Sequence, residues 1–118
     1  MSLNKIQIIK SKIEKTLHDN KAAEVKIIDL RNKTSIADFM IIASGTSSKH
    51  IQALSEMVLI QLKKNGVKNS YLEGKSSSEW KLVDGIDIIV HIFHPNKRKF
   101  YDLEKMWSEM VPKERLII

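Results

Sequence analysis

The apolar residues of this chain recur at helical spacing in two stretches. The first stretch predicts an amphipathic helix over residues 3–19, because its apolar residues recur every three or four positions among Lys, Gln and Glu. Its apolar positions are Leu3, Ile6, Ile9, Ile13 and Leu17. A second helix is expected after the turn at residues 44–48, and Gly66 is its natural stop. Its apolar positions are Ile51, Leu54, Val58, Leu59 and Leu62.

Short runs rich in β-branched residues predict the strands. Residues 24–30 and 38–44 are separated by a polar stretch and predict a hairpin, whose second strand is expected to be fully buried. A third strand is expected around Tyr71 and Leu72, after the second helix. A strand, helix, strand succession favours a parallel right-handed crossover, so the sheet is expected to be mixed.

A last hairpin is predicted from residues 79–83 and 87–93, with residues 88–93 as a central strand. From about Asn96 the apolar spacing predicts a final helix that Pro112 helps to end. The resulting order is α-β-β-α-β-β-β-α. This order predicts an α/β fold with about five strands and helices packed on the sheet, formed by residues 1–118 as a single domain.

Charge changes this picture only moderately. The chain has 20 basic and 14 acidic residues, a net charge of +6 and a pI near 9.6, which favours a polyanionic partner such as RNA. The basic residues are dispersed, and only Lys97-Arg98-Lys99 is a tight run. Cysteine is absent, and no apolar stretch approaches the ~18 residues of a membrane span, so we expect a cytoplasmic protein without a membrane partner.

Two patterns suggest ligand chemistry without strongly favouring it. His91 and His94 are close in sequence, but residues three apart in a strand face opposite sides of the sheet, so no metal site is expected. Ser44-Gly45-Thr46-Ser47 precedes a helix and could offer amides to a phosphate. It lacks the lysine ending of a P-loop, and a capped strand-to-helix junction is the favoured interpretation.

The last hairpin is locally acidic in a basic protein. Its carboxylates, in a stretch with only Lys75 and Lys81 as counter-charges, are Glu73, Glu79, Asp84 and Asp87. Three interpretations are open: a Mg²⁺ or acid/base site, solvated turns, or a docking surface for a basic partner. Trp107 is expected in the core, whereas Trp80 and Tyr101 suit either core packing or an interface.

The order and spacing of several motifs between about residues 4 and 108 resemble the signature of the Iojap/RsfS family of ribosomal silencing factors. The motifs are residues 41–51, Glu73-Gly74, Trp80, Val83-Asp84, residues 90–93 and residues 98–107. The resemblance implies a fold similar to the nucleotidyltransferase core without its catalytic carboxylates, and hence neither catalysis nor a cofactor. It further implies docking on ribosomal protein L-fourteen of the large subunit. Such docking blocks subunit joining and lowers translation when nutrients are scarce, and homodimers occur in the family. A positive net charge is unusual for a protein that meets a basic partner, and the dispersed lysines could serve nearby ribosomal RNA.

The resemblance also implies a set of partner-binding residues. They are Glu73, Trp80, Asp84, His91, Arg98 and Tyr101. Carboxylates would meet basic groups of the ribosomal protein, and the aromatic side chains would be desolvated anchors. His91 suits equally a hydrogen-bonded imidazole in the core.

Two rival functions and one local departure stay open at this stage. The rivals are a nucleotidyltransferase-like enzyme using Asp84, Asp87 and the residue 44–45 turn, and an RNA-binding module using residues 97–99. The family usually has Asp, any residue, Gly, Asp in the last hairpin, whereas Gly85 comes one position early here. The departure affects the direction in which the Asp84 side chain is expected to point, and it leaves the fold prediction unchanged.

Overall fold

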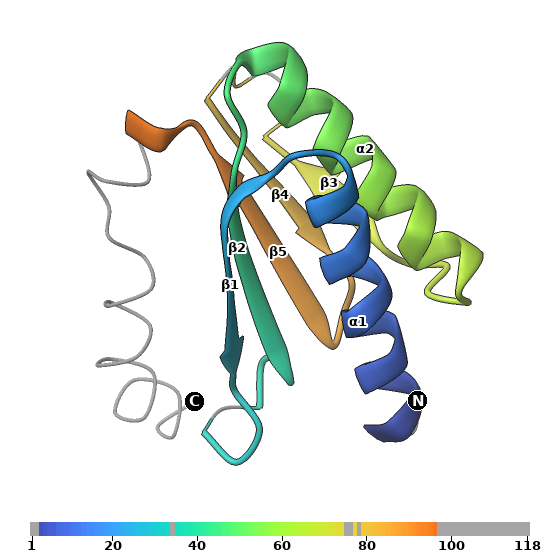
Figure 1. Cartoon of the computed structure of the whole chain (residues 1–118). Helices are drawn as coiled ribbons and strands as arrows, with labels where there is room; N and C mark the ends of the chain where they lie inside the picture. Colours follow the sequence, from blue (N-terminus) through green and yellow to red (C-terminus); the bar gives the residue numbers. More distant parts are fainter. Residues whose placement is uncertain (1–2, 34, 75–76, 78, 97–118) are drawn as a thin grey trace.

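A computed structural model describes residues 3–33, 35–74, 77 and 79–96 of the chain. Two helices lie side by side over one face of a five-stranded sheet (Figure 1). The elements are α1 (Leu3–Asp19), β1 (Ala23–Asp29), β2 (Phe39–Ser44), α2 (Ser48–Lys64), β3 (Tyr71–Glu73), β4 (Trp80–Asp84) and β5 (Ile88–Phe93). The predicted order and the mixed α/β fold are confirmed over this range, and the predicted final helix lies outside the described residues.

The strands are arranged in the order β1-β2-β5-β4-β3. β2 and β5 are parallel, and the other neighbours are antiparallel, so the two hairpins, the mixed sheet and the central place of residues 88–93 are confirmed. β3 runs in the direction of β2, as the predicted crossover requires. It does not pair with β2, because β5 and β4 lie between them.

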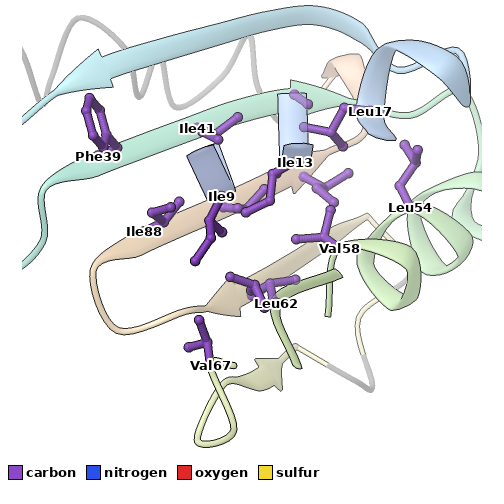
Figure 2. Close-up of a cluster of buried hydrophobic side chains, with 14 of the residues drawn as sticks. Ile9, Ile13, Leu17, Phe39, Ile41, Leu54, Val58, Leu62, Val67 and Ile88 are labelled. Carbon is purple, nitrogen blue, oxygen red and sulfur yellow. The ribbon is translucent and has the colours of Figure 1, made fainter. Parts of the chain in front are cut away.

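The larger part of the core lies between the helices and the sheet. Figure 2 shows Ile9 and Ile13 of α1 with Leu54, Val58 and Leu62 of α2, gathered over the strands. Their spacing of four residues puts them on one side of each helix, which is the stripe predicted from the sequence. Neither described helix is long and apolar enough to cross a membrane.

The opposite face of the sheet has a second, smaller cluster. Successive residues of a strand point to opposite faces, so Ile41 joins the helix-side cluster while Met40 and Ile42 join the second one. All six residues of β2 are therefore buried, as expected. Phe93 of β5 and half-buried Trp80 of β4 belong to the second cluster, which brings the candidate site residues onto this face.

The ends of α2 follow the local sequence signals. The Ser47 side chain caps the N-terminus by accepting a hydrogen bond from the His50 amide at 3.1 Å. At the other end Gly66 follows the last helical turn with φ of +95°, a conformation that glycine adopts without steric cost. The predicted start and stop of this helix are confirmed.

Candidate functional site

The strand register brings four of the predicted site residues onto one face of the sheet. Trp80 lies opposite Phe93, and Leu82 lies between His91 of β5 and Glu73 of β3. Asp84 lies opposite Tyr71 in the same ladder. Alternation along the strands puts these side chains on the face opposite α1 and α2. We refer to Tyr71, Glu73, Trp80, Leu82, Asp84 and His91 as the sheet-face site.

Trp80 is the aromatic centre of this site. Its ring centroid lies 6.3 Å from that of Phe93 and 6.5 Å from that of His91. The position of Gly74 explains how the indole is accommodated, because a Cβ there would lie 2.8 Å from Trp80 Cε3. The side chain is only half-buried, so one part of the indole packs on the sheet and another is exposed.

His91 is a buried imidazole that supports Trp80. It is 9 % exposed and stacks on Phe93 at 5.8 Å with an interplanar angle of 10°. Trp80 Nε1–H donates a long hydrogen bond of 3.4 Å to His91 Nδ1, which requires that nitrogen to be unprotonated. Burial lowers the pKa of the imidazole to about 4, so His91 is neutral at pH 7. The structure favours the core interpretation of this residue.

Asp84 and Tyr71 form the polar rim of the site. Tyr71 Oη–H donates to Asp84 Oδ2 at 3.1 Å, while Asp84 Oδ1 accepts the Ile86 amide at 2.9 Å. The carboxylate of Asp84, followed by that of Glu73, raises the pKa of the Tyr71 hydroxyl above its usual value of 10. Tyr71 is 46 % exposed, Glu73 is exposed and Asp84 is half-buried, so the rim combines an aromatic hydroxyl with two carboxylates.

The remaining charged residues of the acidic stretch lie outside the sheet-face site. Lys81, expected as a counter-charge, is only 2 % exposed and lies opposite Ile92 of the helix-side cluster. Its Nζ donates to the carbonyl oxygens of Gly74 and Ser77, both at 2.7 Å, and so holds the β3–β4 connection. Asp87 lies in the turn before β5, where its carbonyl oxygen accepts the Asp38 amide at 2.8 Å. The other expected counter-charge, Lys75, lies outside the described residues.

The shifted glycine of the last hairpin has a packing reason. A Cβ on Gly85 would lie 2.7 Å from Leu62 Cδ2 and 2.8 Å from the Ile88 carbonyl oxygen, so the site admits no side chain. The left-handed backbone of the turn falls one position later, on Ile86 with φ of +71°. Asp84 still aligns with Tyr71 across the ladder, and its side chain caps the turn.

Neither weak ligand pattern forms a site in the described part of the chain. No group of three His, Asp or Glu side chains that could hold a metal ion occurs among the residues that the structure describes. At the start of α2 the Thr46 amide donates to His50 Nδ1 at 2.9 Å, and Ser47 accepts the His50 amide. Side chains of the helix start therefore satisfy these groups, which confirms the capped junction.

Sequence reasoning missed Tyr71 as a member of the site. Its only signal is its place two residues before Glu73 in the same strand, and the antiparallel pairing that aligns it with Asp84 is not visible locally. Arg98 and Tyr101, predicted for the same surface, lie outside the described residues, as do Trp107 and the run of residues 97–99. Four of the six predicted residues are thus placed together.

Comparisons with known proteins add the family context. Residues 4–116 match the family model described as "Ribosomal silencing factor during starvation". Ribosomal silencing factor RsfS of Zymomonas mobilis is 42 % identical over 93 residues, 79 % of this chain and 70 % of that protein. A mouse protein named "Mitochondrial assembly of ribosomal large subunit protein 1" is 27 % identical, over 78 % of this chain and 42 % of its own.

A solved structure agrees with these sequence matches. A crystal structure of a Chromobacterium violaceum protein superposes with a TM-score of 0.81 at 36 % identity, covering 87 % of this chain and 86 % of that one. At this identity the likeness extends beyond a shared fold. The described sheet and helices are therefore the arrangement found in an experimentally determined relative.

Proposed function

The chain belongs to the RsfS family of ribosomal silencing factors, and we propose that it binds the large ribosomal subunit and blocks association with the small subunit. The observation that carries this proposal is the family match over residues 4–116, nearly the whole chain. The name of the mouse relative, which refers to the large ribosomal subunit, supports the choice of subunit. Blocked association would lower translation when nutrients are scarce.

The sheet-face site is the proposed contact with ribosomal protein L-fourteen. Glu73 and Asp84 would pair with lysine or arginine side chains of that basic partner, because charge-assisted hydrogen bonds are strong and directional. Trp80 would be the apolar anchor, since a half-buried indole beside a polar rim has the composition of an interface centre. His91 would hold the indole in place from below.

In this proposal the protein acts by occupying a surface, and it catalyses no reaction and needs no cofactor. It would do so as a single cytoplasmic domain spanning residues 1–118, with ribosomal RNA near the docking surface. A homodimer is a compatible state of the free protein. Arg98 and Tyr101 would extend the docking surface beyond the described residues.

Sedimentation tests the proposal directly. Purified large and small subunits are mixed with and without the protein and separated on a sucrose gradient, and each fraction is probed for the protein. We expect the protein to migrate with the large subunit and whole ribosomes to decrease. Protein that remains at the top of the gradient, with whole ribosomes unchanged, would contradict the proposal.

A pair of variants assigns the binding to the sheet-face site. Trp80→Ala is expected to weaken binding to the large subunit by ~2 kcal/mol, or about 30-fold, because central aromatic anchors dominate interface energies. Ile60→Ala removes a 64 % exposed apolar side chain from α2 on the opposite layer and serves as the matched control. Equal binding by both variants, each shown to be folded by circular dichroism, would move the contact away from Trp80.

A further inference from the structure

The beginning of α1 and the end of α2 gather lysine side chains at one end of the helix layer. Lys12 Nζ donates to Asn65 Oδ1 at 2.8 Å, and Lys5 Nζ lies 3.6 Å from where a Cβ of Gly66 would be. Lys5 and Lys12 are two helical turns apart, so they project from the same side of α1. The residues of this group, which we call the lysine end, are Lys5, Lys12, Lys63, Lys64 and Lys68, all exposed.

The two segments that carry this group have no acidic residue of their own. Neither residues 4–13 nor residues 57–72 include an Asp or a Glu. Lys63 and Lys64 occupy the last turn of α2, where a positive charge also complements the helix dipole. That effect does not account for Lys5 and Lys12, which come from the other helix, or for Lys68, which follows α2.

The lysine end and the sheet-face site lie on different layers and have opposite charge. Glu73 and Asp84 belong to the face of the sheet that α1 and α2 do not cover. The Lys12 contact to the neutral Asn65 amide joins the two helices without using a carboxylate. A basic protein partner suits the acidic site, and a polyanion suits the lysine end.

We propose that the lysine end is a second docking surface, which binds the phosphate backbone of RNA while the sheet-face site binds protein. The choice of RNA among polyanions rests on the proposed ribosomal function. Every nucleotide has the same phosphate, so binding through phosphates is independent of the RNA sequence. Lysines that neutralise phosphates also release counterions, so the affinity falls steeply with salt. Two surfaces on opposite layers would hold the factor by protein and RNA together.

The first measurement uses the full chain and a short fluorescein-labelled single-stranded RNA. Anisotropy titrations between about 50 and 200 mM salt give the slope of log K against log salt concentration. Lys63→Gln, Lys64→Gln and Lys68→Gln are combined in one variant. This triple variant should reduce the magnitude of the slope by about 2, because each phosphate contact to a single strand contributes about 0.7.

A second triple variant, Lys26→Gln, Lys33→Gln and Lys49→Gln, controls for net charge. These three lysines are exposed and lie on β1, in the turn after it and at the start of α2. The control variant should keep the wild-type slope. An equal reduction in both variants, or binding to phosphatidylglycerol vesicles without binding to RNA, would overturn the proposal.

Sedimentation of the same variants separates this inference from the proposed function. Trp80→Ala should weaken large-subunit binding about 30-fold and keep the RNA titration of the wild type, because the substitution leaves the lysine end unchanged. If wild-type protein fails to bind large subunits but shows the lysine-dependent RNA slope, the proposed function fails and the RNA surface stands. If it binds large subunits and the lysine-end variant binds RNA as the wild type does, the RNA surface fails alone.

Discussion

Ile86 has the least favourable backbone conformation for its residue type among the described residues of the last hairpin. Its φ of +71° lies in the left-handed region, where a β-branched side chain clashes with its own backbone. Asp84 Oδ1 accepts the Ile86 amide at 2.9 Å, and the Asp87 amide donates to the Gly85 carbonyl oxygen at 2.8 Å. The turn is thus held by hydrogen bonds on both sides of a strained residue.

Ile86→Gly is therefore expected to stabilise the protein. Glycine at this position removes the strain of a left-handed non-glycine backbone, which should add ~1–2 kcal/mol to the free energy of unfolding. The added freedom of glycine in the unfolded chain offsets ~0.5–1 kcal/mol of this gain. The net gain should raise the melting temperature by a few degrees, measured by circular dichroism. Ile86→Val, which keeps a β-branched side chain at the same φ, should give no gain; a higher melting temperature for both variants would exclude backbone strain as the cause.

His91 gives the folded state a pH dependence of defined sign. Burial lowers the pKa of its imidazole from 6.5 in the unfolded chain to about 4 in the folded one. Between these values the unfolded chain takes up a proton that the folded chain does not, so stability falls as pH drops from 6.5 towards 4. The full loss attributable to this residue is ~3 kcal/mol, because a tenfold difference in proton affinity corresponds to about 1.4 kcal/mol.

Urea unfolding at pH 7, 5.5 and 4.5 measures this dependence. His91→Phe removes the titrating group and should flatten the curve in this range, even where it changes the stability at pH 7. His18→Gln, which removes an exposed histidine from α1, is the matched histidine substitution for comparison. A His91→Phe curve parallel to that of the wild type would assign the acid sensitivity to other groups.

At the scale of elements, local sequence signals define most of the fold. Helical periodicity predicted α1 and α2, and short apolar, β-branched runs on either side of turn residues predicted both hairpins within one or two residues of their observed ends. Pairing between distant elements was not accessible in the same way. The parallel ladder of β2 with β5 joins residues about fifty positions apart, and no local pattern specifies that β5 lies next to β2.

The same distinction applies to the candidate site. Trp80, Glu73 and Asp84 could be named from their residue types and the family resemblance, but their common face depends on the register of β3, β4 and β5. Lys81 holds the β3–β4 connection because its side chain is buried, and composition does not reveal that burial. Residue types thus indicated the chemistry of the site, and long-range pairing determined which side chains share it.

The N-cap of α2 is the local signal with the clearest energetic consequence. Ser47→Ala removes the acceptor of the His50 amide and should cost ~1 kcal/mol, the usual value for a lost serine cap. The midpoint of urea unfolding reports this loss. Ser48→Ala alters the exposed first residue of the helix and should stay within ~0.5 kcal/mol of the wild type. Equal effects of the two substitutions would mean that the cap contributes nothing specific.

At the scale of the whole molecule, charge is divided between the two layers. The helix layer carries the lysine end, whereas the sheet face opposite α1 and α2 carries the Glu73 and Asp84 carboxylates despite a net charge of +6. A basic partner approaching the sheet face would be attracted by the local carboxylates and repelled by the rest of the protein. The acidic rim therefore has its largest effect on orientation during encounter, through complementary potential at short range.

Charge reversal at one rim position tests this arrangement. Glu73→Lys should slow association with large subunits about tenfold near 50 mM salt, and the difference should shrink towards 1 M as the Debye length falls to about 3 Å. Glu56→Lys makes the same change in net charge on α2, away from the sheet face, and should associate at the wild-type rate or faster. Stopped-flow kinetics with labelled protein measures both rates. If both substitutions slowed association equally, net charge would govern encounter; a difference confined to Glu73→Lys at low salt would mean that the sheet face directs it.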